Sequence, residues 1–455
     1  MSSETRRPNV IVFFTDQQRH DTTGVHGCPL DLTPNFDRMA TEGTHVAYSF
    51  TCQPVCGPAR SCLQTGMYAT ETGCWRNGIP LSQDKKTLAQ YFKEAGYHTG
   101  YIGKWHLAGS EPVPPEQRGG YDYWLASNTL EHTSDAYDCV VYDNDGNPVK
   151  LPGYRVDALT DAAIRYVDNH KDEPFFLFMS FLEPHHQNHR DDYPAPPGYA
   201  ERYAGKWIPP DLQALGGSSF QHLPGYFGMV KRLDEALGRL RDSLQSLGLD
   251  KDAIILFTSD HACHFKTRNG EYKRSCHDSS LRVPTALIGP GFFGGGKVGS
   301  LVSLVDLPPT LLDAAGIPVP EIMQGNSFLP LLRSDTEAQS AWQTEVFAQI
   351  SESQVGRCIR THRWKYSVFA PDKRGGKDPA SETFVEEFLY DLLADPYELT
   401  NLVAHVSHQA VRDHLRSRLI ARMTAAGESE PVIEPSPLPP VSAGQRHVSE
   451  EEVLS

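Results

Sequence analysis

Residues 9–15 read Asn9-Val10-Ile11-Val12-Phe13-Phe14-Thr15, an unbroken run of apolar, β-branched and aromatic side chains. A strand without a polar face is typical of a parallel sheet that is covered by helices on both sides. Further predicted strands at residues 97–102, 175–182, 253–258 and 283–288 alternate with helical patterns. This alternation predicts an α/β fold with a mainly parallel sheet sandwiched by helices.

Polar residues follow four of the predicted strands, at the point where each strand ends. They are Asp16 and Gln17, then Lys104 and His106, then His185, and finally Asp260 with His261. Because ligands of open α/β sheets bind beyond the carboxyl ends of the strands, we expect these side chains to meet at one edge of the sheet. Carboxylates and an imidazole are ligands for a divalent cation. The alternative for each aspartate is a turn or a helix cap.

Residues 54–66 place a cysteine at the start of a predicted helix. Pro58 is expected as the first helical residue and Gly66 as the stop, so that Cys56 lies beside unpaired N–H groups. The positive end of a helix favours an anion, either a thiolate or a bound sulfate or phosphate. The alternative is that Cys56 is inert core packing.

Positive and titratable side chains complete the candidate site. Transfer of a sulfuryl or phosphoryl group needs fixed positive charge on its oxygens, and the available cations are Arg60, Lys104 and Lys273. His106 and His185 belong to the residue type that exchanges protons near neutral pH. Taken singly, each of these residues has an ordinary structural explanation, and it is the set that points to catalysis.

Several short motifs follow one another along the chain. They are residues 9–17, Cys56-x-Pro58-x-Arg60, Gly103-Lys104-Trp105-His106-Leu107, Ser180 to His185, Thr258-Ser259-Asp260-His261, Lys273 with Arg282-Val283-Pro284, and Tyr390-Asp391-Leu392 with Asp395-Pro396 and Asn401-Leu402. In this order they resemble the motifs of the type I sulfatases, a family of the alkaline phosphatase superfamily. The resemblance runs from about Pro8 to Leu402.

This resemblance implies an alkaline-phosphatase-like sheet with a smaller C-terminal antiparallel-sheet subdomain. In the family, the cysteine that matches Cys56 is oxidised to formylglycine by a separate maturing enzyme, and the hydrated aldehyde is the nucleophile. The resemblance assigns the metal to Asp16, Gln17, Cys56, Asp260 and His261, and it places Arg60, Lys104, His106, His185 and Lys273 around the sulfate. Many members have a second aspartate where Gln17 stands and an asparagine where His261 stands. Calcium is the first expectation, and manganese or magnesium are alternatives because calcium prefers an all-oxygen shell.

The sequence therefore predicts a sulfatase acting on a sulfate ester of a small molecule or glycan, with a sulfated carbohydrate as the favoured class. Polar loop residues that would suit a hydroxylated ring are His132, His186, His189, Arg190, His264, Arg268 and Asn269. Two alternatives stay open. The departures at Gln17 and His261 also resemble phosphonate monoester and phosphodiester hydrolases of the superfamily. A chain whose Cys56 is never oxidised would be a non-catalytic anion-binding protein.

The composition of the chain disfavours several other classes of protein. The chain has 455 residues with 39% hydrophobic and 22% charged residues, as in soluble globular proteins, and its formal charge of −15 disfavours nucleic acid and anionic membranes as partners. No apolar run approaches the roughly 20 residues of a membrane span, and the start lacks a signal-peptide core, so we expect a cytoplasmic protein. Nine cysteines without a Cys-x-x-Cys pair favour a reducing compartment and disfavour a structural zinc site.

The domain organisation follows from a change near Gly325, where alternating strands and helices give way to predicted short antiparallel strands. We expect a catalytic domain at residues 1–325, a C-terminal subdomain at 326–426 and a proline-rich, extended or disordered tail at 427–455. The sequence leaves the oligomeric state open.

Overall fold

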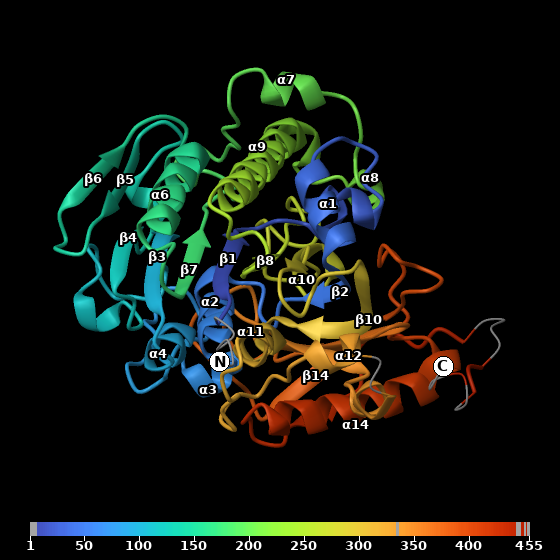
Figure 1. Cartoon of the computed structure of the whole chain (residues 1–455). Coiled ribbons are helices and arrows are strands. Elements are labelled where there is room, and N and C mark those ends of the chain that lie inside the picture. The colour runs from blue at the N-terminus through green and yellow to red at the C-terminus, as the bar shows by residue number, and fades with distance from the viewer. Residues whose placement is uncertain (1–6, 334–335, 443–446, 450–451, 453–455) are drawn as a thin grey trace.

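The protein is built around two β-sheets (Figure 1). The computed structural model describes residues 7–333, 336–442, 447–449 and 452. The larger sheet has ten strands in the order β10-β2-β9-β8-β1-β7-β3-β4-β5-β6, and the smaller has five in the order β11-β12-β13-β14-β15.

The centre of the larger sheet is parallel. Strand β1 (Asn9–Thr15) lies between β7 (Phe175–Ser180) and β8 (Ala253–Ser259), and β7 is followed outward by β3 (His98–Lys104) and β4 (Tyr123–Ser127), all in parallel pairs. The predicted parallel α/β core is therefore confirmed. Antiparallel pairs occur toward the flanks, at β9 (Ala286–Ile288) with β8 and β2 (Thr44–Phe50), and at β5 (Cys139–Tyr142) with β4 and β6 (Pro148–Leu151).

The two faces of β1 bury alternate side chains against different helices, as a pleated strand requires. Ile11 and Phe13 pack with α1 (Pro34–Glu42), α6 (Arg155–Asn169) and α9 (Ser219–Ser246). Val10, Val12 and Phe14 pack with α2 (Cys56–Thr65), α4 (Leu88–Glu94) and α11 (Leu307–Ala314). Shorter helices are α3 (Ala69–Thr72), α5 (Leu130–Thr133), α7 (Tyr199–Tyr203), α8 (Pro210–Leu215), α10 (Asp278–Leu281), α12 (Leu329–Leu332) and α13 (Thr336–Ala341).

Some elements differ from the sequence prediction. The sequence predicts a long amphipathic helix over residues 226–247, but α9 begins seven residues earlier, at Ser219, and Pro224 and Gly225 lie inside it. The stretch at 109–152 is rich in Gly, Pro, Asp and Asn, which predicts a long loop, but it contains β4, β5 and β6, which extend the sheet at its edge. Strands β2 and β10 (Gly296–Ser303) were also not predicted, and β9 covers only part of 283–288. Polar or glycine-rich sequences carry little strand signal at sheet edges.

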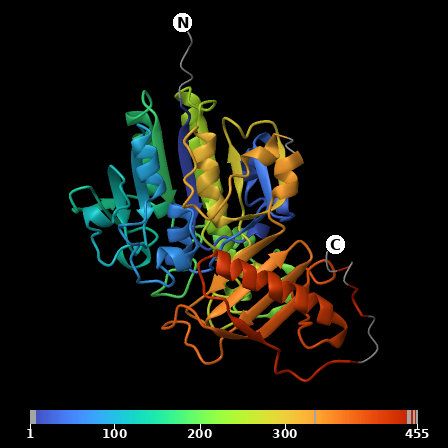
Figure 2. The same cartoon turned by 90° about the horizontal axis from the view of Figure 1, so that it is seen from below.

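The C-terminal sheet consists of β11 (Glu345–Ile350), β12 (Gly356–Thr361), β13 (Trp364–Phe369) and β14 (Thr383–Asp391) in antiparallel pairs, as predicted, with helix α14 (Gln409–Ala425) packed against it (Figure 2). Strand β15 (Val432–Glu434) adds in parallel to β14, so part of the expected tail is extended and paired. Residues 443–446, 450–451 and 453–455 of that tail lie outside the described residues. The domain limits themselves stay a prediction.

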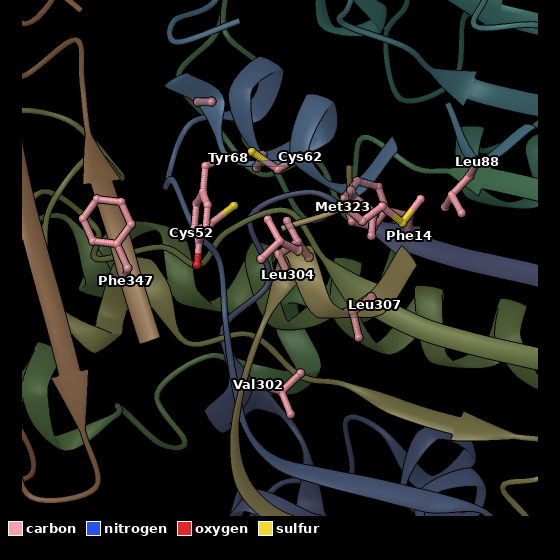
Figure 3. Close-up of a cluster of buried hydrophobic side chains, with 14 of the residues drawn as sticks. Phe14, Cys52, Cys62, Tyr68, Leu88, Val302, Leu304, Leu307, Met323 and Phe347 are labelled. Carbon is pink, nitrogen blue, oxygen red and sulfur yellow. The ribbon is translucent and has the colours of Figure 1, made fainter. Parts of the chain in front are cut away.

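One hydrophobic cluster joins the two sheets. It includes Phe14 of β1, Leu307 of α11 and Phe347 of β11, and Tyr68 contacts Phe347 with ring centroids 5.4 Å apart (Figure 3). All nine cysteines are buried and free. Within the part of the chain that the structure describes, no helix combines the length and the apolar character needed for a membrane crossing.

Candidate active site

The polar residues predicted at the strand ends lie together at one edge of the sheet. Asp16 follows β1, Asp260 and His261 follow β8, Lys104 is the last residue of β3, and His185 comes shortly after β7. The four strands are consecutive neighbours in the order β8-β1-β7-β3. Their parallel direction places all four carboxyl ends at the same edge, so the geometric basis of the prediction is correct.

Four buried residues offer ligand atoms within 4.8 Å of one another: Asp16, Cys56, Asp260 and His261. The Cys56 Sγ lies 3.3 Å from His261 Nε2 and 3.7 Å from Asp16 Oδ1. The imidazole of His261 donates from Nδ1 to the Ala262 carbonyl at 3.0 Å, which leaves Nε2 as an acceptor facing the group. A hydrogen bond of this kind orients a metal-binding histidine.

Gln17 adds an unsatisfied oxygen to this group. Its backbone adopts a left-handed φ of 69°, and its N–H donates to Asp260 Oδ1 at 3.0 Å. Its side-chain Nε2 donates to Cys263 Sγ at 3.3 Å, while the buried Oε1 has no hydrogen-bond partner among the described residues. Buried polar atoms are normally paired, so an orphaned oxygen on a residue whose backbone is hydrogen-bonded to Asp260 fits a bound divalent cation.

Arg60 and Lys104 hold the carboxylates in place. Arg60 Nη2 lies 2.9 Å from Asp16 Oδ2 and 3.3 Å from Asp260 Oδ2, and its Nη1 donates to the Lys104 carbonyl and to Ser180 Oγ. Lys104 Nζ donates to Asp16 Oδ2 at 2.9 Å. Burial would raise the pKa of Asp16, but the positive charges of Lys104 and Arg60 hold that pKa well below its usual range.

Lys273 contacts the side chain of Cys56 directly. Its Nζ lies 2.8 Å from Cys56 Sγ and 3.2 Å from both His185 Nε2 and His261 Nε2. His185 donates from Nδ1 to the carbonyl of His186, so its Nε2 is an acceptor toward Lys273. Burial and the charge of Lys273 lower the pKa of His185, which favours the neutral ring.

Cys56 opens helix α2, although the helix begins at Cys56 itself and Pro58 is its third residue, not its first. The reason is the bond from the Ala59 N–H to the Val55 carbonyl, which closes the first turn one step earlier. Gly66 ends the helix with a φ of 71°, as predicted. Burial raises the pKa of the Cys56 thiol, but the charges of Lys104 and Lys273 outweigh this and lower the pKa well below the usual value, so the site favours an anion at residue 56.

A pocket of about 320 Å³ opens over Cys56, and residues from several loops line it. Of the predicted site residues, His106, His185 and Lys273 line this pocket with Cys56. Arg60 and Lys104 instead lie behind the carboxylates, where they contact Asp16.

The lining residues that were not identified from the sequence include Asn77 and Glu131. Asn77 Oδ1 accepts the Gly57 N–H at 2.9 Å, and Glu131 Oε1 lies 3.1 Å from Lys104 Nζ. Glu131 belongs to a helix of four residues and Asn77 to a turn before Gly78. A polar residue in a turn or very short helix has no periodic signal that separates it from surface residues.

The polar loop residues divide into three groups. His186 lines the pocket. His264, Arg268 and Asn269 hold the loop that carries Lys273, because His264 Nε2 and Asn269 Nδ2 each lie 3.0 Å from the Lys273 carbonyl and Arg268 donates to the carbonyls of Tyr397 and Glu398. His189 and Arg190 face Asp135, and His132 lies in α5 without lining the pocket described here.

Comparisons with known proteins give consistent matches. The model of the Sulfatase family matches residues 8–317, and the model described as N-sulphoglucosamine sulphohydrolase, C-terminal, matches residues 270–425. An ulvan-active sulfatase of Formosa agariphila is 30% identical over 442 residues, which cover 93% of this chain and 83% of that protein. An N-acetylglucosamine-6-O-sulfatase of Bacteroides thetaiotaomicron is 25% identical and covers 91% of this chain and 86% of its own length.

A solved structure, described as a complex with its substrate D-glucosamine-2-N,6-O-disulfate, superposes with a TM-score of 0.77. It is 25% identical to this chain and covers 94% of this chain and 99% of its own. The same arrangement of a large sheet and a smaller C-terminal sheet therefore occurs in a protein with known ligand chemistry.

Proposed function

Because this chain belongs to the sulfatase family of the alkaline phosphatase superfamily, and is thus a sulfuric ester hydrolase, we propose that it removes sulfate from a carbohydrate sulfate ester. We propose that residue 56 is the nucleophile after conversion of Cys56 to formylglycine by a separate maturing enzyme. The observation that carries the proposal is the position of Cys56 Sγ, which lies 2.8 Å from Lys273 Nζ and 3.3 Å from His261 Nε2.

Two observations support a carbohydrate as the alcohol part of the ester. The named relatives act on ulvan or on an N-acetylglucosamine sulfate, and the superposed structure holds a sulfated glucosamine. The walls of the pocket carry amide, imidazole and phenol groups at Asn77, Asn188, His186 and Tyr272. Such groups exchange hydrogen bonds with hydroxyls, as a sugar ring requires.

Asp16, Gln17, Asp260 and His261 would hold the divalent cation of the family, together with residue 56. When bound, the cation would draw negative charge from a sulfate oxygen and orient the nucleophile. Calcium is the first choice, with manganese or magnesium as alternatives because His261 provides a nitrogen ligand.

The side chains around residue 56 would bind the sulfate oxygens, exchange protons and hold Asp16 in place. The hydrated aldehyde would supply an oxygen nucleophile in place of sulfur. Lys273 Nζ, beside both Sγ and His185 Nε2, would place positive charge where sulfate oxygens bind. His185 and His106 would exchange protons with the leaving alcohol and the nucleophile. Arg60 and Lys104 would keep Asp16 ionised and fixed.

The first test is mass spectrometry of the tryptic peptide from Met39 to Arg60, taken from protein produced together with a maturing enzyme. Formylglycine or its hydrate is expected at residue 56. A panel of sulfated mono- and oligosaccharides, scored for released sulfate, is then expected to give a substrate that a Cys56→Ala variant does not turn over. Unmodified thiol with no turnover would instead support an anion-binding protein.

A second test separates the remaining alternative and identifies the metal. Faster hydrolysis of an aryl phosphonate ester than of the matched aryl sulfate would favour a phosphonate monoester or phosphodiester hydrolase. Chelation is expected to abolish turnover and to lower the melting temperature, because a ligand that binds only the folded state stabilises it by mass action. Separate addition of calcium, manganese or magnesium then shows which ion restores both.

A further inference from the structure

An acidic side chain lies in the wall of the pocket that is proposed to bind an anion. Glu131 of α5 lines the same pocket as Cys56, His106 and Lys273, and it is only 4% exposed. A buried carboxylate beside an anion site weakens the attraction for every anion that enters. Its presence in such a pocket therefore calls for a specific role.

The contacts of Glu131 show which positive charge it offsets. Glu131 Oε1 lies 3.1 Å from Lys104 Nζ and 3.9 Å from His106 Nδ1, while the buried Oε2 has no hydrogen-bond partner among the described residues. Lys104 also contacts Asp16 Oδ2 at 2.9 Å, so one ammonium group serves two carboxylates. Burial would raise the pKa of Glu131, but the neighbouring positive charge, above all that of Lys104, outweighs burial and lowers that pKa to about 2. The carboxylate is thus ionised at neutral pH.

The charges of the side chains around the pocket then compensate one another, before the two positive charges of the proposed cation are counted. The cations Arg60, Lys104 and Lys273 face the carboxylates of Asp16 and Asp260 and that of Glu131. Without Glu131 the same group would carry one more unit of positive charge. The first two carboxylates belong to the proposed metal group, whereas Glu131 lies on the pocket side of Lys104 and lines the space where an ester would bind.

Esters that resemble one another in shape differ in charge. A sulfate ester, a phosphonate monoester and a phosphodiester each carry one negative charge, whereas a phosphate monoester carries nearly two at neutral pH because its second pKa is about 6. In a pocket of reduced dielectric constant, one additional charge near a carboxylate changes affinity by about tenfold or more. A fixed negative charge therefore discriminates by charge where shape cannot.

We propose that Glu131 is a specificity-determining residue that makes the pocket select singly charged esters over doubly charged phosphate monoesters. This inference deepens the proposed function and rests on it for the site of ester binding. It assigns Glu131 no part in bond cleavage.

The test compares Glu131→Gln with wild type, both matured, at a pH where the phosphate monoester is a dianion. The substrates are 4-nitrophenyl sulfate, 4-nitrophenyl phosphate and 4-nitrophenyl phenylphosphonate. The variant is expected to raise the kcat/KM ratio of phosphate to sulfate about tenfold or more, and to leave the ratio of phosphonate to sulfate within about threefold. Unchanged ratios, or an equal rise for both phosphorus esters, would overturn the proposal.

Two further variants separate charge from position. Glu131→Asp keeps the charge and is expected to keep the wild-type preference, whereas loss of that preference would show that only the position of Lys104 matters. Glu271→Gln removes a carboxylate from the same pocket, but this side chain is 48% exposed and paired with Arg274, so its ratios are expected to stay within about threefold. A change as large as that of Glu131→Gln would contradict a specific role.

A binding measurement makes the outcome independent of catalysis. Calorimetric titration of the unmodified Cys56 protein with the same phosphate and sulfate esters is expected to show that Glu131→Gln gains affinity for the phosphate ester selectively. Absence of sulfate ester turnover in the matured wild type would refute the proposed function alone. Unselective binding by both proteins would refute the role of Glu131 alone.

Discussion

Two clusters of buried charge differ in whether they leave ligand atoms unused beneath a pocket. The active-site cluster is formed by Asp16, Arg60, Lys104 and Asp260. The seam cluster, between the two sheets, is formed by Asp278, Arg360, Lys365 and Glu398. Each contains a lysine with no exposed side-chain surface.

The seam cluster is closed in the sense that each of its charged groups has an oppositely charged partner, although the buried Arg360 Nε has no hydrogen-bond partner among the described residues. Lys365 binds both Asp278 and Glu398, Arg360 Nη2 lies 3.2 Å from Asp278 Oδ2, and Glu398 Oε2 accepts the Asp278 N–H at 2.8 Å. The active-site cluster instead borders the orphaned Gln17 Oε1 and the Cys56 thiol under a pocket. Buried charge by itself therefore does not mark catalysis; unused ligand atoms beneath a pocket do.

The largest expected effect is on activity and comes from the open cluster. Lys273→Met removes the cation beside residue 56 and is expected to lower kcat/KM by about 10²–10³-fold with little change in melting temperature. Steady-state kinetics and thermal unfolding measure the two quantities. Lys266→Met is the matched control, because Lys266 lines the same pocket but is 33% exposed and paired with Asp191, and a change below about threefold is expected.

The closed cluster is expected to show the opposite pattern. Lys365→Met leaves Asp278 and Glu398 without their shared cation and should destabilise the fold by about 3–5 kcal/mol, as measured by denaturant unfolding. The kcat of the molecules that remain folded is expected to stay within about threefold. A variant of normal stability with lost activity would show that the two clusters are not functionally distinct.

Another buried carboxylate, that of Asp306, sharpens the comparison of the two clusters, because no cation pairs with it among its described contacts. Asp306 accepts from the backbone N–H groups of Ser303 and Asn326 and from Gln343 Nε2, and burial raises its pKa to about 6. In contrast, Lys365 and Arg360 overcome burial and lower the pKa of Asp278.

The sign of the pH effect follows from the raised pKa. The protonated Asp306 carboxyl stabilises the fold fully below pH 3.8, and this contribution is lost as the pH rises through about 6. The difference in unfolding free energy between wild type and Asp306→Asn is expected to change by at most about 3 kcal/mol between pH 4 and pH 7. Equal pH slopes for the two proteins would contradict a raised pKa.

The smallest expected effect connects the two clusters. Arg268 lies on the loop of Lys273 and donates to the carbonyls of Tyr397 and Glu398 at 2.8 and 2.9 Å. Arg268→Ala is expected to lower kcat about tenfold by loosening that loop, and to have no further effect in a Lys273→Met background. Arg418→Ala, which removes contacts to Thr344 and Glu345 elsewhere in the C-terminal subdomain, is the control. Additive losses in the double variant would exclude a positioning role through Lys273.

The open cluster could be predicted from the sequence because each of its parts has a local signal. A buried strand is followed at once by a polar residue at Asp16 and Asp260 and ends in one at Lys104, and parallel pairing brings such ends together. The closed cluster has no such signal. Its members Asp278 and Lys365 are separated by 87 residues, and only the docking of one sheet on the other brings them together. Glu131 was not predicted for a similar reason, because only its contact with Lys104 in the folded chain gives it significance.

The prediction of the fold failed where the local sequence and the tertiary packing favour different structures. Pro224 indicates a helix boundary, yet α9 continues through it, because residues on both sides such as Leu223 and Phe227 are buried in one cluster. Strand β6 alternates between exposed and partly buried residues and depends on pairing with β5. Tertiary packing determines the structure of both elements. The local sequence reveals neither the buried cluster around α9 nor the pairing of β6 with β5.

The aromatic contact between Tyr68 and Phe347 has a consequence for engineering. The shared cluster means that the C-terminal sheet has no separate interior along that seam, so a chimaera that exchanges it with a relative would have to import the matching surface of α2 and α3 as well. A fragment that ends near Gly325 would expose this apolar seam to water, and insoluble material is the expected product of its expression.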